Sequence, residues 1–250
     1  MRNIKLTIEY DGSRYNGWQR LGKGESSNTI ENKLLEIINK LNGEVTELFC
    51  GARTEVGVHA YAQIANFKTN CDLNSVEIKN YFNRYLPMDI AVTLVEKMPE
   101  RFHSSLNAKS KKYIYRIATG DVPSVFDRKY TYYSFAKLDI ELMKEASKAF
   151  IGKHDFKSFS TVKKSKSTER EIYSVEICST EKEIQITIHA NDFLHNMARM
   201  MVATLMEIGA GKSKPTIIDQ ILSNTLAETT IVPADASGLF LLEVEYENEN

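Results

Sequence analysis

A guanidinium and a carboxylate stand two residues apart in a short stretch, GARTEVGVHA at 51–60, that contains two glycines. The two residues are Arg53 and Glu55. A carboxylate held in a fixed loop can act as a nucleophile or remove a proton, and an arginine beside it can bind a phosphate. An arginine and a glutamate in a glycine-containing loop are also commonly a surface ion pair. This stretch alone therefore does not establish a catalytic site.

The residues on either side of this stretch have the periodicity of strands. Ile4, Leu6 and Ile8 alternate with polar residues near the N-terminus, which predicts a strand with one buried face. Two further strands are predicted near 45–50 and 60–67, one before and one after the stretch. We therefore expect the arginine and the carboxylate in a loop anchored on a sheet, where a functional group can be held in a fixed geometry.

Capping signals place two helices in the same part of the chain. Asn28 and Glu31 have the spacing of a capping box, and Asn74 and Glu77 are expected to open a second helix. With a strand at 90–95, the order of elements is β-α-β-β-α-β. The later residues repeat this order with one extra helix, and the expected elements are strands at 113–117, 173–178, 184–189 and 240–246 and helices at 139–150, at 193–208 and after Pro215.

The predicted fold class is α+β. We expect two pseudo-symmetric β-α-β-β-α-β halves, each with the split βαβ pattern of RRM-like domains, which form a mixed or antiparallel sheet with helices on one face. The boundary is expected near 99–107, so that the halves are residues 1–100 and 101–250.

Composition excludes several classes of protein. With 250 residues, 42% of them hydrophobic, the chain can bury a large core and is neither fibrous nor disordered. Three widely spaced cysteines and five histidines show neither a disulfide framework nor metal-ligand spacing, so we expect no metal. We see no signal peptide and no apolar run that could span a membrane, which predicts a cytoplasmic protein. A net charge of -1 means that any RNA surface must come from local basic clusters.

The stretch at 51–60 resembles the G-R-T-D-x-G-V-H-A loop of the tRNA pseudouridine synthase A family. Other segments resemble the same family in the same order and together cover nearly the whole chain: YDGS at 10–13, GWQ at 17–19, FH at 102–103, AKSKKYIYR at 108–116, HDFKSF at 154–159, NDFLH at 191–195 with the residues at 197–209, and ASGLFL at 236–241.

The resemblance implies an enzyme, an isomerase that converts uridine to pseudouridine in the anticodon arm of tRNA, at tRNA positions 38–40, and that forms a homodimer. This reaction breaks the bond between ribose C1′ and uracil N1 and rejoins the base through C5, so it involves no net electron transfer and no cofactor is expected. It needs a carboxylate that acts on the ribose and a pocket that retains the detached base.

The resemblance also assigns roles to four residues. Glu55 stands at the position of the catalytic carboxylate. Arg53 would hold the flipped nucleotide and its phosphate, and Tyr113 would stack on the target base. Arg199, which lies inside an apolar helical pattern, would pair with the catalytic carboxylate and keep it ionised. Residues 1–100 would thus carry the catalytic loop, and residues 101–250 the target-base pocket and the RNA-binding surface.

Each of these residues also has an ordinary structural interpretation. Arg53 could be a surface charge and Arg199 could lie on the solvated side of its helix. Tyr113 and Tyr115 share one face of a predicted strand, so either could be a core aromatic. Basic residues that could contact phosphates form two clusters, in which any single lysine is by default a solvated charge; they are Lys109, Lys111, Lys112 and Arg116, and Lys163, Lys164, Lys166 and Arg170.

Two residues of the loop depart from the family pattern. Ala52 replaces the glycine directly before the arginine, with Gly51 one place earlier, and Glu55 replaces an aspartate. One extra methylene moves a carboxylate by about 1 Å or more, which can lower a rate on the order of a hundredfold. The displaced glycine changes where the backbone can turn, which could draw the longer side chain of Glu55 back and compensate for its extra methylene.

Two interpretations of function therefore stay open, a pseudouridine synthase that uses Glu55 and a catalytically silent RNA-binding protein of the same fold. A glycosidase is a more distant alternative, because that mechanism usually needs two carboxylates and the sequence marks out one.

Overall fold

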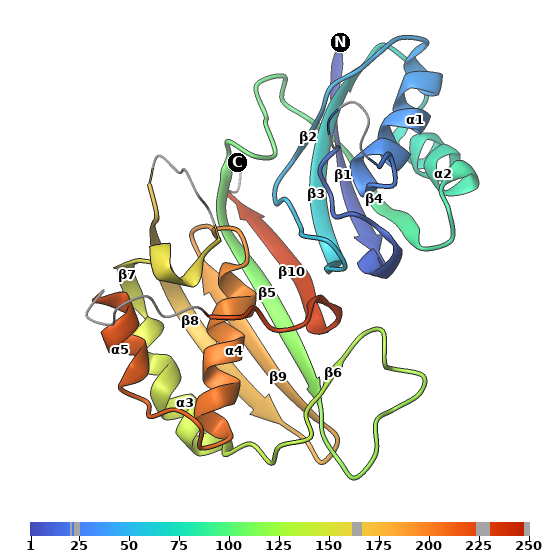
Figure 1. The fold of residues 1–250 in the computed structure, drawn as a ribbon. Coiled ribbons are helices and arrows are strands. Elements are labelled where there is room, and N and C mark those ends of the chain that lie inside the picture. The colour runs from blue at the N-terminus through green and yellow to red at the C-terminus, as the bar shows by residue number, and fades with distance from the viewer. Residues whose placement is uncertain (21, 23–25, 162–166, 224–230, 248–250) are drawn as a thin grey trace. The chain divides into compact units, whose positions relative to one another are not determined.

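The computed structural model describes residues 1–20, 22, 26–161, 167–223 and 231–247. The chain forms two compact units, drawn in Figure 1. Unit 1 comprises Met1–Lys109 and Phe240–Asn250, and unit 2 comprises Ser110–Leu239. The division expected from the sequence falls at residue 100 and leaves the last strand with the second half, whereas the compact units change at 109 and again at 239.

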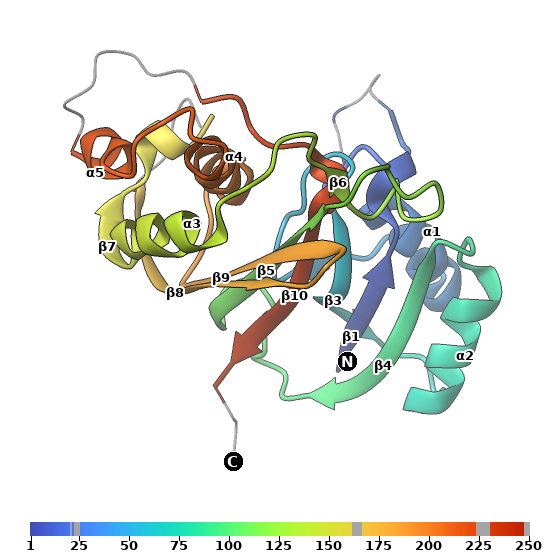
Figure 2. The same ribbon diagram turned by 90° about the horizontal axis from the view of Figure 1, so that it is seen from below.

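Unit 1 is a mixed sheet covered by helices α1 and α2. Its strands follow the order β4-β1-β3-β10, with β2 also paired to β3; β10 pairs with β3 in parallel, and β1 with β3, β1 with β4 and β2 with β3 pair antiparallel. Helices α1 and α2 lie together on one side of the sheet (Figure 2). The elements are β1 (Arg2–Tyr10), α1 (Ile30–Asn42), β2 (Leu48–Cys50), β3 (His59–Thr69), α2 (Ser75–Tyr85), β4 (Ile90–Met98), β10 (Leu239–Tyr246) and the short 3-10 helix η1 (Gly12–Arg14).

The core of unit 1 follows from the two periodicities in its sequence. Ile4, Leu6 and Ile8 on β1 are at most 2% exposed, as expected for alternate residues on the buried face of a strand. Leu34 of α1 and Phe82 of α2 are 0% exposed and supply the apolar faces of the helices. Removal of this apolar surface from water is the main term that stabilises the unit.

The two predicted helix starts have different outcomes. The start at Asn74 and Glu77 is confirmed, and the two residues form a capping box, because each side chain accepts a hydrogen bond from the backbone N–H of the other residue. The box at Asn28 and Glu31 is wrong, because Thr29 is the N-cap of α1. The carboxylate of Glu31 instead accepts a hydrogen bond from a loop amide, so tertiary contacts with the preceding loop outweigh the local signal.

Unit 2 is an antiparallel sheet of strand order β5-β9-β8-β7, with short β6 parallel to β5, and its described residues also form helices α3, α4 and α5. Its elements are β5 (Ala108–Ala118), β6 (Tyr132–Tyr133), α3 (Ile140–Ser147), η2 (Lys148–Phe150), β7 (Gly152–Asp155), η3 (Lys157–Phe159), β8 (Glu169–Ser179), β9 (Glu183–Ala190), α4 (Met197–Gly209), α5 (Ile217–Leu222) and η4 (Ala236–Gly238). Helix α3 packs against α4 and against β8.

The α+β class, the mixed and antiparallel pairing and the expected order of the longer elements are confirmed. The sequence did not predict β6 or β7, which have two and four residues and too little periodicity to stand out. It also predicted the start of α4 at Phe193, whereas the helix begins at Met197. The reason is Asn196, whose φ of 64° is left-handed and cannot continue a right-handed helix.

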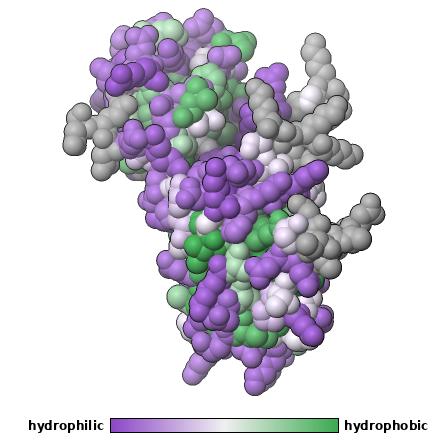
Figure 3. Space-filling model, turned by 90° about the vertical axis from the view of Figure 1, so that its left-hand side faces the viewer, coloured by the Kyte–Doolittle hydropathy of each residue, from purple (hydrophilic) through white to green (hydrophobic). Residues whose placement is uncertain are grey.

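Hydrophilic residues cover much of the molecular face seen in Figure 3, with smaller hydrophobic areas between them. Among the described residues, no helix combines the length and the apolar character that a membrane crossing requires.

Candidate active site

Glu55 lies in the loop that joins β2 to β3 in unit 1. The amide of Val58 donates a hydrogen bond of 3.2 Å to the carbonyl oxygen of Glu55 and closes a turn. Gly57 is the third residue of this turn and has a φ of 78°, the left-handed conformation that a type II turn requires there. Glu55 is half-buried, so its backbone is held by the turn while its carboxylate stays partly accessible to solvent.

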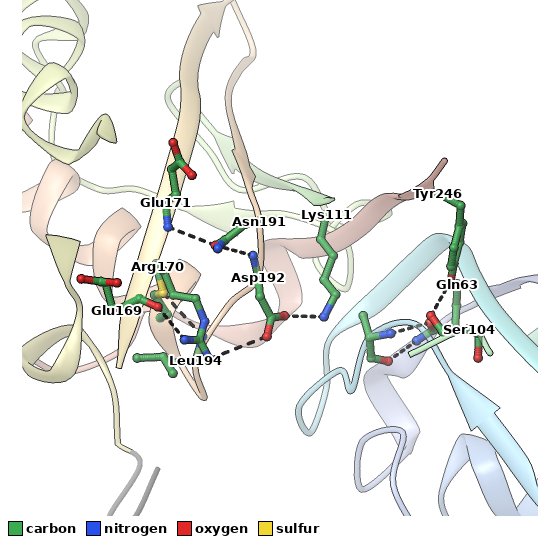
Figure 4. A network of polar contacts seen from close by, with 12 residues as sticks. Gln63, Ser104, Lys111, Glu169, Arg170, Glu171, Asn191, Asp192, Leu194 and Tyr246 are labelled. Carbon is green, nitrogen blue, oxygen red and sulfur yellow. Dashed lines mark hydrogen bonds and ion pairs between the residues drawn. The ribbon is translucent and has the colours of Figure 1, made fainter. Parts of the chain in front are cut away.

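Neutral hydrogen bonds in the interior of unit 1 fix the start of this loop. Gln63, which is 0% exposed and labelled in Figure 4, donates through Nε2 to the carbonyl oxygen of Ala52 at 2.6 Å and accepts from the Ala52 amide at 3.2 Å. The hydroxyls of Tyr10 and Thr54 share a hydrogen bond of 2.7 Å. Burial raises the pKa of the Tyr10 phenol, so this hydroxyl stays neutral over the physiological range.

A second loop, at 11–18, packs against the backbone of the first through two glycines. A Cβ on Gly12 would lie 1.9 Å from the carbonyl oxygen of Val58, and a Cβ on Gly17 would lie 2.8 Å from that of Thr54. Gly17 also has a φ of 81°, and the next residue, Trp18, donates its amide to the carbonyl oxygen of Thr54 at 3.0 Å. The YDGS and GWQ segments therefore act as a wall that fixes the position of the Glu55 turn.

The displaced glycine also has a structural reason. A Cβ on Gly51 would lie 2.7 Å from the hydroxyl of Tyr246 and 3.0 Å from a methyl carbon of Val244 on β10. A side chain at position 51 would thus push against the last strand. The methyl group of Ala52 is 3% exposed and is accommodated in the interior.

Arg53 is exposed, in contrast to the buried residues on either side of it in the loop. An exposed guanidinium can form two parallel hydrogen bonds to a phosphate or a carboxylate, a pairing that a lysine cannot reproduce. The loop thus carries one exposed cation, Arg53, and one half-buried carboxylate, Glu55, and buried contacts inside unit 1 hold its backbone in place.

Tyr113 and Tyr115 lie on the same face of β5 in unit 2, and both are buried, at 6% and 0% exposure. The ring of Phe193 meets Tyr113 edge to face, with centroids 4.9 Å apart. The hydroxyl of Tyr115 is committed to a structural bond, because it donates to the carbonyl oxygen of Asp235 at 2.9 Å. The strand spacing alone left the two tyrosines equivalent, and these contacts distinguish Tyr115 as the one that bonds a backbone segment.

Arg199 lies on α4 and is partly buried. Its Nε donates to the carbonyl oxygen of Ala234 at 2.6 Å, while its own carbonyl oxygen accepts from the Ala234 amide at 3.1 Å. Its Nη1 donates to Oδ1 of Asn196 at 3.1 Å. The pKa of the adjacent Asp235 is lowered, chiefly by the hydroxyl of Ser237 and more weakly by the charge of Arg199. The guanidinium is therefore oriented by the backbone of the segment at 234–235.

The structure places the four predicted site residues in two pairs. Arg53 and Glu55 share the loop of unit 1, and Tyr113 and Arg199 belong to unit 2. Tyr115 and Arg199 both bond to the segment at 234–235, which links the strand of Tyr113 to α4.

The sequence did not predict the residues that hold the Glu55 loop and Arg199 in place, namely Gln63, Asn196 and Asp235. Two of them have partners that are distant in the chain: Gln63 bonds Ala52, 11 residues back, and the carbonyl oxygen of Asp235 accepts from Tyr115, 120 residues back. Asn196 bonds Arg199, three residues ahead, just before the start of the helix. Gln63 alone gave a signal, because it is a polar residue inside a largely apolar strand and a buried amide needs partners.

The basic clusters are only partly described. Lys163, Lys164 and Lys166 lie outside the described residues. Arg116 forms an ion pair with two hydrogen bonds to Glu183, and Lys109 pairs with Glu247 at 2.6 Å. In the described part of the chain, no three or more His, Cys, Asp or Glu side chains gather where they could hold a metal ion.

Comparison with known proteins identifies the family. Residues 146–247 match the sequence model of a family described as tRNA pseudouridine synthase. A protein of Bacillus anthracis named tRNA pseudouridine synthase A 2 is 43% identical over 247 residues, which are 98% of this chain and 100% of the relative. Proteins named tRNA pseudouridine synthase A 2 of Clostridium perfringens and tRNA pseudouridine synthase A 1 of Clostridium tetani are 41% and 40% identical, again over 98% of this chain and 100% of each relative. The chain belongs to the tRNA pseudouridine synthase A family and is an isomerase.

Proposed function

We propose that the protein converts uridine to pseudouridine in tRNA and that Glu55 is its catalytic carboxylate. The observation that carries this proposal is the fixed geometry of the Glu55 turn. Buried hydrogen bonds from Gln63 and Tyr10 and the close approach of two glycines hold a half-buried carboxylate at the family's catalytic position. Such support is typical of a reacting group, because a displacement of about 1 Å can cost on the order of a hundredfold in rate.

The reaction is balanced without a cofactor. The C1′–N1 bond breaks, a C1′–C5 bond forms, the proton on C5 is lost and N1 gains a proton. Glu55 would attack the ribose or remove a proton from it, and Arg199 would keep that carboxylate ionised. Tyr113 would stack on the target base near C5, and Arg53 would hold the phosphate of the flipped nucleotide.

The finer features of the proposal come from the family. The uridines would be those of the anticodon arm, and the enzyme would act as a homodimer in the cytoplasm, where tRNA is its partner. Support for RNA contact comes from the basic residues of unit 2, among them Lys111 and Arg170. A silent RNA-binding protein is the competing function, since Glu55 is longer than the family's aspartate.

The test is release of tritium from tRNA labelled at C5 of uridine. The proposal expects catalytic release by the wild-type protein, and loss of that release when the uridines of the anticodon arm are replaced by cytidine. Binding of tRNA with no release would show the silent protein instead. Release that survives the replacement would move the substrate outside the anticodon arm.

A further inference from the structure

Three charged side chains meet at one end of the sheet in unit 2. Lys111 near the start of β5 and Arg170 near the start of β8 both approach the carboxylate of Asp192, which follows β9 (Figure 4). The Lys111 ammonium forms a short ion pair with Oδ1 of Asp192, and Nη2 of Arg170 lies 3.7 Å from Oδ2. We call these three residues the ion cluster.

The strand register places the ion cluster beside the proposed target-base contact. Lys111 and Ile172 both pair with Ala190 on β9, so Arg170, two residues before Ile172, lies opposite Asp192. Lys111 shares a strand face with Tyr113, two residues or about 6.6 Å further along β5. Asp192 directly precedes Phe193, whose ring contacts Tyr113.

The two cations are more firmly held than the anion. The side chains of Lys111 and Arg170 are 14% and 16% exposed, whereas that of Asp192 is 44% exposed. Nη1 of Arg170 donates to the carbonyl oxygens of Ser167 at 3.2 Å and Glu169 at 2.7 Å, which fixes the guanidinium plane. Among the described residues, the buried Nε of Arg170 has no hydrogen-bond partner.

This arrangement has the chemistry of an anion site. A guanidinium and an ammonium that converge on one point suit a phosphate, which offers more acceptor oxygens than a carboxylate. The ion cluster carries two positive charges and one negative charge, so it retains a net attraction for an anion. A carboxylate that is nearly half exposed can turn away when a stronger anion arrives.

We propose that Lys111 and Arg170 form a binding site for an RNA backbone phosphate next to Tyr113, and that Asp192 occupies this site when no RNA is bound. The carboxylate then acts as an internal competitor that weakens tRNA binding. The inference rests on the proposed function, which makes the surface around Tyr113 the place where the target nucleotide binds.

The test compares Asp192→Asn with a matched control by measuring tRNA affinity across a salt series. Glu96→Gln is the control, because Glu96 forms an ion pair of 2.7 Å with Lys5 in unit 1. The side chains of Glu96 and Lys5 are 40% and 17% exposed, close to the 44% and 14% of Asp192 and Lys111. Each variant removes one negative charge. We expect Asp192→Asn to tighten tRNA binding on the order of tenfold at low salt, the equivalent of one further charge-assisted contact.

The gain from Asp192→Asn should shrink as salt rises, because salt screens the exposed site. It should also be smaller in a Lys111→Gln background, where one of the two cations is missing. Glu96→Gln should change affinity by less than about twofold. Equal effects of the two single variants, or a gain that Lys111→Gln does not reduce, would overturn the inference.

The readout is binding, so it is separate from the test of the proposed function. If the wild-type protein released tritium while Asp192→Asn bound tRNA like wild type, the phosphate site would be refuted and the enzyme would stand. If no tritium were released but Asp192→Asn still tightened tRNA binding, the site would stand on a silent RNA-binding protein.

Discussion

The Glu55 turn and the ion cluster are stabilised in opposite ways. The turn is held by neutral hydrogen bonds inside unit 1 and by backbone atoms packed against Gly12 and Gly17. The ion cluster is held by charges at the end of a sheet, where one partner, Asp192, is 44% exposed. Neutral buried contacts are insensitive to salt, whereas half-exposed ion pairs are screened by it.

The difference indicates that the two regions have separate roles, the Glu55 turn in positioning a side chain and the ion cluster in RNA affinity. A reacting carboxylate needs a fixed position, and steric contacts with glycines supply it. An RNA surface needs adjustable attraction, which charges supply. Changes to the glycines that pack against the turn should therefore reduce turnover. Changes to charged side chains should instead alter tRNA binding or the pH dependence of stability.

Apart from changes to Glu55 itself, the largest effect is expected for Gly17→Ala. Its Cβ would lie 2.8 Å from the carbonyl oxygen of Thr54 and 3.1 Å from the carbonyl carbon of Glu55, so the Glu55 turn must move. Turnover should fall on the order of a hundredfold or more. Rates of pseudouridine formation at saturating tRNA measure this.

Gly43→Ala is the matched control for backbone strain. Gly43 has a φ of 72°, close to the 81° of Gly17, but a Cβ there meets nothing within 4 Å. Both variants should lose about 1 kcal/mol of unfolding free energy from the left-handed backbone. A Gly17→Ala enzyme as active as Gly43→Ala would show that the wall at 11–18 does not position Glu55.

Tyr113→Phe should have the next largest effect, and on turnover alone. The ring keeps its contact with Phe193, and on the proposed function it can still stack on the target base, while the hydroxyl proposed to lie near that base is lost. We expect turnover to fall on the order of a hundredfold with tRNA affinity unchanged. Single-turnover rates and binding measured side by side check this, and equal rates for the two proteins would leave Tyr113 as a packing residue.

The smallest expected effect concerns the ion pair of Glu183 with Arg116. Hydrogen bonds from Arg116 lower the pKa of Glu183 below its ordinary value, against the opposing effect of burial. The pair therefore stabilises the fold fully above the unfolded pKa and loses this contribution as the pH falls through the folded one. Glu183→Gln should cost less than about 1 kcal/mol at pH 7 and less still near pH 3.

Denaturant unfolding of both proteins at the two pH values measures the difference. A cost for Glu183→Gln that is constant or larger in acid would contradict the ion-pair account. If the loss of turnover in Gly17→Ala stayed the same across the salt series used for Asp192→Asn, the contrast between the Glu55 turn and the ion cluster would be sharper.

Much of the fold could be predicted from the sequence because its signals are local. The alternation of Ile4, Leu6 and Ile8 and the capping box at Asn74 depend on neighbours a few residues away. The wrong cap at Asn28 shows the limit. Its side chain donates to the carbonyl oxygen of Arg14, 14 residues back, and this tertiary bond has no local signature.

The candidate site divides in the same way. The sequence motifs predicted Glu55 and Arg199 as site residues, but not the residues that hold them. Gln63 reads as one more polar residue of a strand, and its role appears only when the fold brings it to Ala52. Asp192 likewise reads as a turn residue until two strands place Lys111 and Arg170 beside it.

The central claim is that a turn rebuilt around the longer side chain makes Glu55 catalytic. Its most direct measurement is pseudouridine formation by wild type, Glu55→Gln and Glu55→Asp, with tRNA binding measured in parallel. We predict an active wild type, no product from Glu55→Gln because the charge is gone, and a clear drop for Glu55→Asp because the shorter carboxylate falls short by about 1 Å. Binding should change little in all three. An inert wild type that becomes active as Glu55→Asp would contradict the account and identify a silenced enzyme.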